Sequence, residues 1–385
     1  MIRHNKVLIG KILLVLVLLG SGLAAAGCVG LGAGQLGWSG ATIADGTIFV
    51  GSVGKLVALN TSDGSSLWEE VIETSGSTGG FGCAVPAMAV TIYGTPAVDG
   101  DLVFAGGYDG KVYAYSTDLG SLRWVYPREG NLHSIVGGLV AGEGMLYFGT
   151  AGGIVYALDA TTGDRVWQFE NGGEIWSTPA MDGDTLYIGS FDEGLYAIDA
   201  TTGEEKWAEP FETRGPIITT PLVYNDIVYI GSFDRHFYAI DVTNGQLIWQ
   251  FPDTDEAENK SEKWFWASPV VYNNTIYAPS MDGWVYVLDA ESGTMITMID
   301  LGSPISSSPA VVNDKVVMAT EEGKVFSIDT VSHQEMELRD LGVRILAPLV
   351  ASDGIIYVHT QEDEALYAYN TEMGATVWDT PLASE

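Results

Sequence analysis

One phrase recurs eight times along this 385-residue chain, and it constrains the fold more than any other feature of the sequence. A complete copy, EIWSTPAMDGDTLYIGSFDEGLYAIDATTGEEKW, runs from Glu174 to Trp207. The eight copies are marked by equivalent positions at Gly51, Gly106, Gly149, Gly189, Gly231, Pro279, Ala319 and His359. Their spacing, roughly 40 to 55 residues, is the period of a β-propeller blade.

Each copy alternates apolar and polar residues with a period of two, as in LYAID at 195–199, which indicates strands and excludes helical repeats. Four strands are expected in the complete copy: STPAMD from Ser177, TLYIGS from Thr185, GLYAID from Gly194 and a fourth that begins at Trp207. The sequence therefore predicts an all-β protein, an eight-bladed β-propeller of four-stranded antiparallel blades over residues 37–385. Blade eight must meet blade one, but which terminus donates a closing strand is left open.

A tryptophan follows the last turn glycine of most copies by four residues. It occurs at Trp68, Trp124, Trp167, Trp207, Trp249 and Trp378. A large ring placed identically in each blade suits the gap between neighbouring twisted sheets, so we interpret these six as structural blade-docking residues. Blades six and seven have Thr297 and about Met336 there, which predicts weaker docking.

The first 27 residues are typical of a lipoprotein-type signal peptide. Basic residues precede the apolar stretch 12–19, and small residues lead to AAGC at 25–28. This motif resembles a bacterial lipobox, which implies lipidation of Cys28, a flexible tether over 28–36 and anchoring to a membrane. The expected location is the periplasmic face of the outer membrane in a two-membrane cell and otherwise the extracellular face. The alternative is an ordinary secretion signal cut near the alanine run.

The chain's charge argues against nucleic-acid binding. It has 17 lysines and arginines against 50 aspartates and glutamates, a formal charge of -33 that would repel phosphates. Cys83 is the only cysteine besides Cys28, so no internal disulfide is expected if Cys28 is acylated.

No pattern of catalytic, cofactor-binding or metal-ligating residues is present in the sequence. There is no adjacent cysteine pair, no Cys-x-x-Cys-His and no Gly-x-Ser-x-Gly. The four histidines after the leader, His133, His236, His333 and His359, are scattered over different blades without the spacing of zinc ligands. We therefore expect no catalytic residue, no metal and no cofactor.

A recognition surface is predicted where the loop before each first strand reaches one rim of the ring. These loops contain His133, Trp176, Arg214, Trp264, Phe265, Trp266 and Arg344. Aromatic and arginine side chains are frequent anchors of protein interfaces. In EKWFWASP, the three consecutive aromatics cannot all face inward, so partner binding and packing remain alternatives for each of them.

The phrase ALDATTGDRVW at 157–167 resembles the tryptophan-docking motif of the pyrroloquinoline-quinone-like propeller family. Within it, the lipobox, single ring and length resemble the BamB-type lipoproteins of outer-membrane assembly. This resemblance implies a non-catalytic scaffold that binds a POTRA domain of a barrel-inserting protein through an Arg-Gly pair, matched here by Arg214 and Gly215. The acidic residues that the family uses in the following blade's loop are not clearly matched, because Lys263, Trp264, Phe265 and Trp266 stand there.

Two other functions remain as alternatives. The first is a quinone-dependent dehydrogenase, or a relative that binds a small molecule in the central channel. The second is an outward-facing adhesion or glycan-binding propeller whose rim tryptophans stack on sugars.

Overall fold

The computed structural model describes residues 38–74, 88–254 and 260–383. Cys28, Cys83, the predicted signal peptide (1–27) and the predicted tether (28–36) lie outside these ranges. Contacts divide the chain into two units, residues 1–35 and 36–385, and the description below concerns the second.

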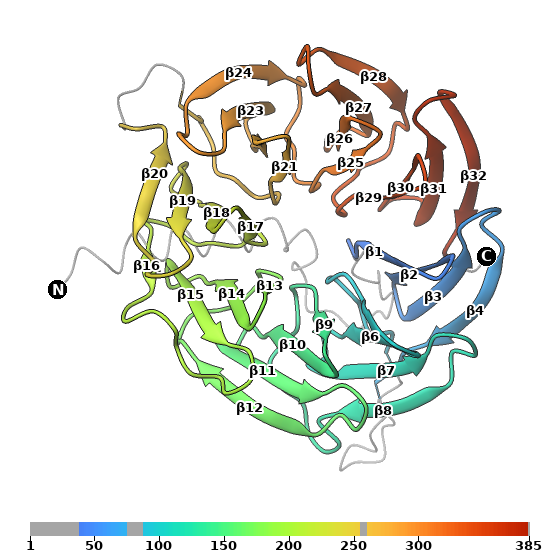
Figure 1. The fold of residues 1–385 in the computed structure, drawn as a ribbon. Helices are drawn as coiled ribbons and strands as arrows, with labels where there is room; N and C mark the ends of the chain where they lie inside the picture. Colours follow the sequence, from blue (N-terminus) through green and yellow to red (C-terminus); the bar gives the residue numbers. More distant parts are fainter. Residues whose placement is uncertain (1–37, 75–87, 255–259, 384–385) are drawn as a thin grey trace, which may run out of the picture. The chain divides into compact units, whose positions relative to one another are not determined.

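The second unit contains eight four-stranded antiparallel sheets, each built from four consecutive strands, which confirms the eight-bladed propeller. Figure 1 shows the first strands, such as β1, β9 and β13, nearest the centre of the ring and the fourth strands at its perimeter. The first four blades are β1–β4 (Ala41–Ala44, Thr47–Ser52, Lys55–Asn60, Ser66–Val71), β5–β8 (Ala97–Asp99, Leu102–Gly106, Val112–Ser116, Leu122–Tyr126), β9–β12 (Val140–Gly142, Met145–Gly149, Ile154–Asp159, Arg165–Glu170) and β13–β16 (Ala180–Asp182, Thr185–Gly189, Gly194–Asp199, Phe211–Glu212). The last four are β17–β20 (Leu222–Tyr224, Ile227–Gly231, Phe237–Asp241, Leu247–Phe251), β21–β24 (Val270–Tyr272, Thr275–Pro279, Trp284–Asp289, Met295–Asp300), β25–β28 (Ala310–Val312, Lys315–Ala319, Lys324–Asp329, Glu335–Asp340) and β29–β32 (Val350–Ser352, Ile355–His359, Ala365–Asn370, Ala375–Pro381).

Each sheet is buried on both faces by its neighbours, as blade four illustrates. Leu186 and Ile198 oppose each other on β14 and β15 and pack with residues of blade three. Tyr187 and Ala197, on the other face of the same strands, pack with residues of blade five. Because period-two alternation sends side chains to both faces, no blade can bury its apolar residues alone.

The six tryptophans occupy equivalent positions in their blades, and each packs against the next blade. Trp167 donates its Nε1–H to the carbonyl oxygen of Ala200 at 2.9 Å, and its ring covers Gly203. A Cβ at Gly203 would lie 2.7 Å from that ring, and its φ of +76° also favours glycine. The same ring-on-glycine contact is made by Trp68, Trp124, Trp207, Trp249 and Trp378 with Gly120, Gly163, Gly245, Gly293 and Gly64.

The joint between blades six and seven has a different composition. Thr297 stands opposite Val287 in the register that tryptophan occupies elsewhere. The facing turn of blade seven has His333 in place of glycine, at a φ of 55°, and the Tyr277 hydroxyl lies 3.2 Å from its Nδ1. A bulky residue is accommodated in this turn because no tryptophan ring lies over it.

The prediction that the fourth strand of blade four begins at Trp207 is wrong. Lys206 still donates its N–H to Ala197, but the chain then leaves the sheet and rejoins it only at β16, Phe211–Glu212. Pro210, which has no N–H to donate, ends this irregular segment. The first strand is also shorter than predicted, since β13 starts at Ala180 rather than Ser177.

Blade eight contacts blade one through side chains that donate to backbone carbonyl oxygens of blade one. Trp378 donates its Nε1–H to the carbonyl oxygen of Thr61 at 3.0 Å. His359, which is buried, donates Nδ1–H to the carbonyl oxygen of Ser39 at 2.8 Å, because that oxygen can only accept. Neither described end of the chain contributes a strand to the other's sheet.

Candidate interaction surface

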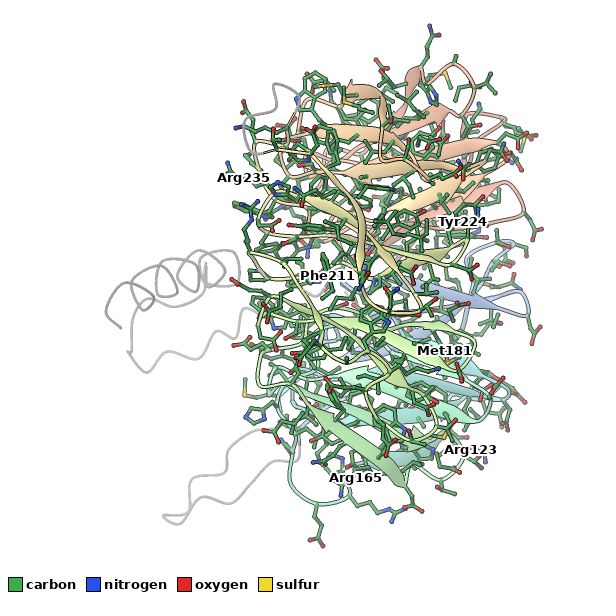
Figure 2. The ribbon with its side chains drawn as sticks, turned by 60° about the vertical axis from the view of Figure 1, so that its left-hand side comes forward. Arg123, Arg165, Met181, Phe211, Tyr224 and Arg235 are labelled. Atoms are coloured by element: carbon green, nitrogen blue, oxygen red, sulfur yellow. The ribbon has the colours of Figure 1, made fainter. Side chains whose placement is uncertain are left out.

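The loops that precede the first strands share a rim with the turns between the second and third strands. This follows from the antiparallel order of each blade, and hydrogen bonds such as Phe191 N–H to the carbonyl oxygen of Glu174 at 2.9 Å link the two. We call this side the channel rim. Figure 2 shows Arg235 on this side of the molecule and Met181 and Tyr224, which belong to the first strands β13 and β17, toward the other.

A narrow channel opens at the centre of the channel rim. Its walls come from the first-strand loops of all eight blades: Trp38, Tyr93, Gly94, Thr95, Val136, Gly137, Gly138, Trp176, Thr178, Ile218, Thr220, Trp266, Ser268, Ser306, Ser308, Leu346 and Pro348. Several hydroxyls of the wall bind neighbouring blades, as when Thr178 accepts from Gly138 N–H at 2.8 Å and Ser308 accepts from Ser268 N–H at 3.0 Å. The cavity measures about 90 Å³, whereas small-molecule pockets are typically roughly 300 to 1,000 Å³.

The residues of the channel do not fit a pyrroloquinoline quinone with its calcium ion. None of the lining side chains is charged, so the wall supplies no carboxylate for Ca²⁺ and no cation for the acidic quinone. Within the described ranges, no group of three or more His, Cys, Asp and Glu side chains is placed to hold a metal ion.

The predicted rim aromatics divide into two classes. Trp176, Trp264 and Trp266 are half-buried on the channel rim. Trp176 packs edge-on against Phe191, with ring centroids 4.8 Å apart. Phe233 lies 5.7 Å from Trp264 and 5.8 Å from Trp266, and we call these three residues the aromatic patch.

Phe265, predicted to bind a partner, is a core residue. Its side chain is 1% exposed and packs against Phe237 and Tyr286 at centroid distances of 5.7 and 6.0 Å. The side chains of these three consecutive residues point in alternate directions. Phe265 therefore packs in the joint between blades five and six, while Trp264 and Trp266 face the rim. We therefore remove Phe265 from the partner surface.

The Arg214–Gly215 pair is fixed by the adjacent turn of blade five. Arg214 donates its backbone N–H to Oδ2 of Asp234 at 2.9 Å. A Cβ on Gly215 would lie 2.6 Å from the backbone nitrogen of Asp234, so only glycine allows the loop to approach so closely. The pair thus holds the Arg214 side chain on the exposed rim in a defined position.

The Arg214 guanidinium also lies over a buried polar cluster. Its Nη2 is 3.3 Å from each ring nitrogen of His236, which is 3% exposed. Because Nδ1 of His236 donates to the carbonyl oxygen of Asp234 at 3.2 Å, Nε2 is the acceptor for Arg214 in the neutral ring. The Tyr238 hydroxyl donates to Oδ2 of Asp234 at 2.6 Å.

The carboxylate of Asp234 is stabilised by this cluster. Burial alone would raise its pKa, but hydrogen bonds from the side chains of His236 and Tyr238 and the backbone N–H of Arg214 lower it to about 2. The hydroxyl of Tyr238 has its pKa raised by burial and by its bond to this carboxylate. The arrangement fixes the charge of Asp234 and the position of the Arg214 side chain.

We expect the stability of the protein to depend on the charge of Asp234 at acidic pH. Since the pKa is lower in the folded state than its usual 3.8, the contribution of the carboxylate is complete above about pH 4 and disappears as the pH falls through about 2. An Asp234→Asn variant should be less stable by about 2 kcal/mol at pH 6, with a smaller difference from wild type at pH 2. Urea unfolding of both proteins between pH 2 and 6 measures this; a pH-independent difference would contradict it.

The remaining predicted rim residues lie apart from the aromatic patch. Arg344 is exposed and pairs with Oε2 of Glu321 at 2.8 Å. His133 is exposed and lies over Gly152, whose Cβ would be 2.3 Å from its Nδ1. The site is therefore centred on blades five and six.

Sequence reasoning missed the aromatics that the second turn of each blade adds to this rim. Phe191 and Phe233 occupy the same place in the repeated SFD at 190–192 and 232–234, and each contacts a predicted rim tryptophan. The recurrence of Phe in this turn of blades four and five could have indicated that these residues add aromatic surface to the rim.

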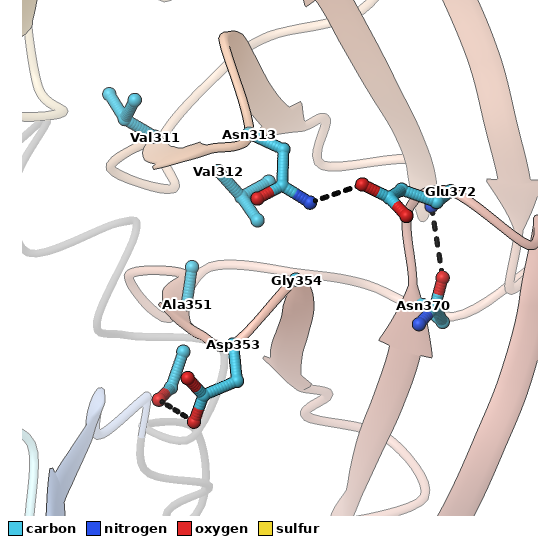
Figure 3. A pocket seen from close by; sticks show the side chains of 9 residues that line it. Val311, Val312, Asn313, Ala351, Asp353, Gly354, Asn370 and Glu372 are labelled. Carbon is cyan, nitrogen blue, oxygen red and sulfur yellow. Dashed lines mark hydrogen bonds between the residues drawn. The ribbon is translucent and has the colours of Figure 1, made fainter.

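A second, polar cavity of about 370 Å³ lies on the opposite rim, between blades seven and eight (Figure 3). Asn313 donates its side-chain N–H to Oε1 of Glu372 across this joint at 3.0 Å. Met336 takes the tryptophan register of blade seven, opposite Ser327, and its side chain is 52% exposed. The joint between blades seven and eight therefore lacks the contact of tryptophan on glycine that is present between most neighbouring blades.

Comparison with known families places this geometry in context. The profile of the family described as outer membrane protein assembly factor BamB matches residues 29–170 and 151–380, which together span almost the whole chain. The chain belongs to this family. It is a member of the BamB-type, pyrroloquinoline-quinone-like propellers, as the docking motif predicted.

Individual relatives are more distant and match only in part. The chain is 34% identical over 134 residues to the serine/threonine-protein kinase AfsK of Streptomyces griseus, which covers 34% of this chain and 15% of the kinase. It is 28% identical over 135 residues to the outer membrane protein assembly factor BamB of Kangiella koreensis, which covers 35% of this chain and 32% of that protein. The chain thus aligns with about a third or less of the length of these relatives.

Solved structures share the fold over most of the ring. BamB from Moraxella catarrhalis superposes with a TM-score of 0.67 at 19% identity, over 88% of this chain and 94% of that one. A europium-containing methanol dehydrogenase superposes with a TM-score of 0.63 at 15% identity, over 88% and 84%. Because BamB and a methanol dehydrogenase share this architecture, function must be argued from the site.

In the part of the chain that the structure describes, no helix has the length and apolar character needed to span a bilayer.

Proposed function

We propose that this protein is a non-catalytic scaffold of the cell envelope, anchored by a lipid on Cys28, with a BamB-like role in the assembly of outer-membrane β-barrel proteins. The family match across residues 29–380 carries this proposal. The proposed partner is a POTRA domain of a barrel-inserting protein, bound at the channel rim through Arg214, Gly215, Trp264 and Trp266, with Trp176 and Arg344 further round the rim.

The geometry of Arg214 supports binding. Its backbone is bonded to Asp234 and its guanidinium to His236, so little side-chain entropy remains to be lost when a partner binds. The neighbouring Trp264 and Trp266 supply half-buried aromatic surface of the kind that forms interface hot spots.

The size and chemistry of the channel argue against the dehydrogenase alternative. A cavity of about 90 Å³ with an uncharged wall has too little volume for a tricyclic quinone and too few charged groups for its carboxylates. No observation favours the glycan-binding alternative over protein binding, because Trp264 and Trp266 flank Phe233 rather than stand free as sugar platforms.

Cross-linking capture from native membranes tests the proposed function. We expect the wild-type chain to capture a POTRA-containing barrel protein and the Arg214→Glu, Trp264→Ala variant to lose at least nine-tenths of it. The matched control is Arg165→Glu, which makes the same charge change at an exposed position of β12 on the perimeter. Capture of no POTRA protein, or equal capture by wild type and the rim variant, overturns the proposal.

A further inference from the structure

Most joints between neighbouring blades share one apolar contact beneath the channel rim. The second strand of a blade ends in a small residue, and an isoleucine or phenylalanine of the next blade packs over it. A Cβ at Gly189, for example, would lie only 2.3 Å from Cγ2 of Ile217. The same contact covers Gly51, Gly106, Gly149 and Gly231, and the residues that make it are Ile92, Ile135, Ile175 and Phe265. All of the covering side chains are buried, so the contact removes apolar surface from water at each joint.

The joint between blades eight and one has a histidine at this place. His359 is the last residue of β30, as Gly189 is of β14. Where these other blades have the covering isoleucine or phenylalanine, the sequence of blade one has Gly37. His359 is 3% exposed and donates Nδ1–H to the carbonyl oxygen of Ser39 across the joint at 2.8 Å. A buried polar ring thus stands where most joints have an apolar contact.

Ser39 connects this bond to the channel wall. Its hydroxyl accepts from the N–H of Gly51 in blade one at 3.2 Å and donates to the carbonyl oxygen of Gly94, in the first-strand loop of blade two, at 3.0 Å. The preceding residue, Trp38, packs on Tyr93 with ring centroids 4.4 Å apart, and both rings line the channel. The bond that Ser39 accepts from blade eight therefore helps to hold one side of the channel wall in place.

Burial keeps the imidazole of His359 uncharged near neutral pH. Burial lowers the pKa of this ring below the usual 6.5 and outweighs the bond to Ser39 and the negative charge of Asp363, which both raise it. Transfer of a charged group into a protein interior costs far more than transfer of a neutral one. Protonation of His359 is therefore coupled to exposure of the ring, which means to a loosening of the joint.

Further charged groups lie near the joint. Glu364 of blade eight accepts from the Ser52 hydroxyl of blade one at 3.3 Å, and burial raises its pKa above the usual 4.5. Lys55 of blade one acts against this shift, and Arg344 is paired with Glu321 of blade seven. Because the pKa of Glu364 is raised in the folded state, its carboxylate costs stability at neutral pH, and acid removes that cost. The effects of Glu364 and of the histidine on the joint therefore have opposite signs.

We propose that the joint between blades eight and one is an acid-sensitive contact, closed while the His359 imidazole is neutral and loosened when this ring takes up a proton. Loosening releases Ser39, and with it Trp38, from their places at the channel wall. The inference is independent of the proposed function, because it concerns how the ring closes rather than what the channel rim binds.

The pH range of the change follows from the histidine. In a loosened joint His359 titrates near pH 6.5, whereas the buried ring takes up a proton only at lower pH. Below pH 6.5 the loosened form therefore binds more protons than the closed form. The equilibrium constant for loosening should rise by up to tenfold for each unit by which the pH falls through this range, and should be constant well above it.

Amide hydrogen exchange of the full-length protein in detergent, followed by mass spectrometry, tests this inference. Division by the intrinsic exchange rates at each pH gives protection factors that can be compared between pH 7.5 and pH 5.5. We expect the protection of β1 and β2 (residues 41–52) to fall at least fivefold on acidification, while that of β13 to β15 in blade four (residues 180–199) changes less than twofold. No fall in β1 and β2, or an equal fall in blade four, overturns the inference.

A His359→Gln variant assigns the effect to this ring, because glutamine can still donate to Ser39 but does not become charged in this pH range. Its protection of β1 and β2 should not fall on acidification, and any contribution of Glu364 is common to both proteins and cancels in the comparison. The matched control is His236→Gln, at a histidine of blade five that is also 3% exposed, which should keep the fall seen in wild type. A fall in His359→Gln as large as in wild type overturns the inference. If His359→Gln does not fold, the comparison of blade one with blade four in wild type decides.

Discussion

Replacing Trp378 by alanine should destabilise the protein by about 3–5 kcal/mol, the usual cost of removing a buried tryptophan. The ring of Trp378 is 8% exposed, covers Gly64 and bonds to Thr61, so it joins the last blade to the first. Because this joint connects segments more than 300 residues apart in sequence, no local chain connection replaces it. Urea unfolding, followed by tryptophan fluorescence and by circular dichroism, measures the loss.

The matched control is Val377→Ala in the same strand, since Val377 is 44% exposed and makes no contact of this kind. That variant should stay within about 0.5 kcal/mol of wild type. Equal stability of the two variants would show that the ring is held closed without the tryptophan, and a loss in Val377→Ala as large as in Trp378→Ala would show that β32 itself, not the docking contact, is responsible.

Within the WFW sequence, alanine at Phe265 should cost about 3–5 kcal/mol of stability, while alanine at Trp264 should cost far less. Phe265 is 1% exposed between blades five and six, whereas Trp264 is half-buried at the rim and its indole N–H has no acceptor among the residues that the structure describes. Denaturant unfolding of both variants measures the difference.

The same two variants divide stability from binding. We expect Phe265→Ala, when assayed well below its unfolding midpoint, to retain partner capture, and Trp264→Ala to lose much of it at near-normal stability. The reverse pattern would mean that Trp264 belongs to the core and Phe265 to the partner surface.

The architecture was predictable because the residues that determine it recur at regular spacing along the chain. Seven spacings near the blade period, and a tryptophan four residues after the turn glycine in six blades, define the ring, its docking contacts and the two blades that lack them. Thr297 and Met336 occupy the tryptophan register as expected. Glycine is needed in this turn only where a tryptophan ring covers it. In blade seven no ring covers the turn, and His333 stands in place of the glycine.

The candidate site was less predictable because it lies in the parts that vary. The side on which Phe265 packs depends on an irregular loop, where neither a period of two nor of 3.6 applies. Phe233 belongs to a different turn from Trp264 and reaches it only through the fold. Likewise, the irregular segment before β16 depends on how the chain leaves the sheet, which alternation alone does not reveal.

The blades of this protein each consist of four consecutive strands, and among the described residues no strand is shared between the first and the last blade. The unit of sequence repetition is therefore also the unit of hydrogen bonding. Duplication or deletion of one repeat would leave every strand paired and would change only the curvature needed to close the circle. In propellers built in this way, the angle between neighbouring sheets then sets the number of blades. The loops of any single blade can change without loss of strand pairing.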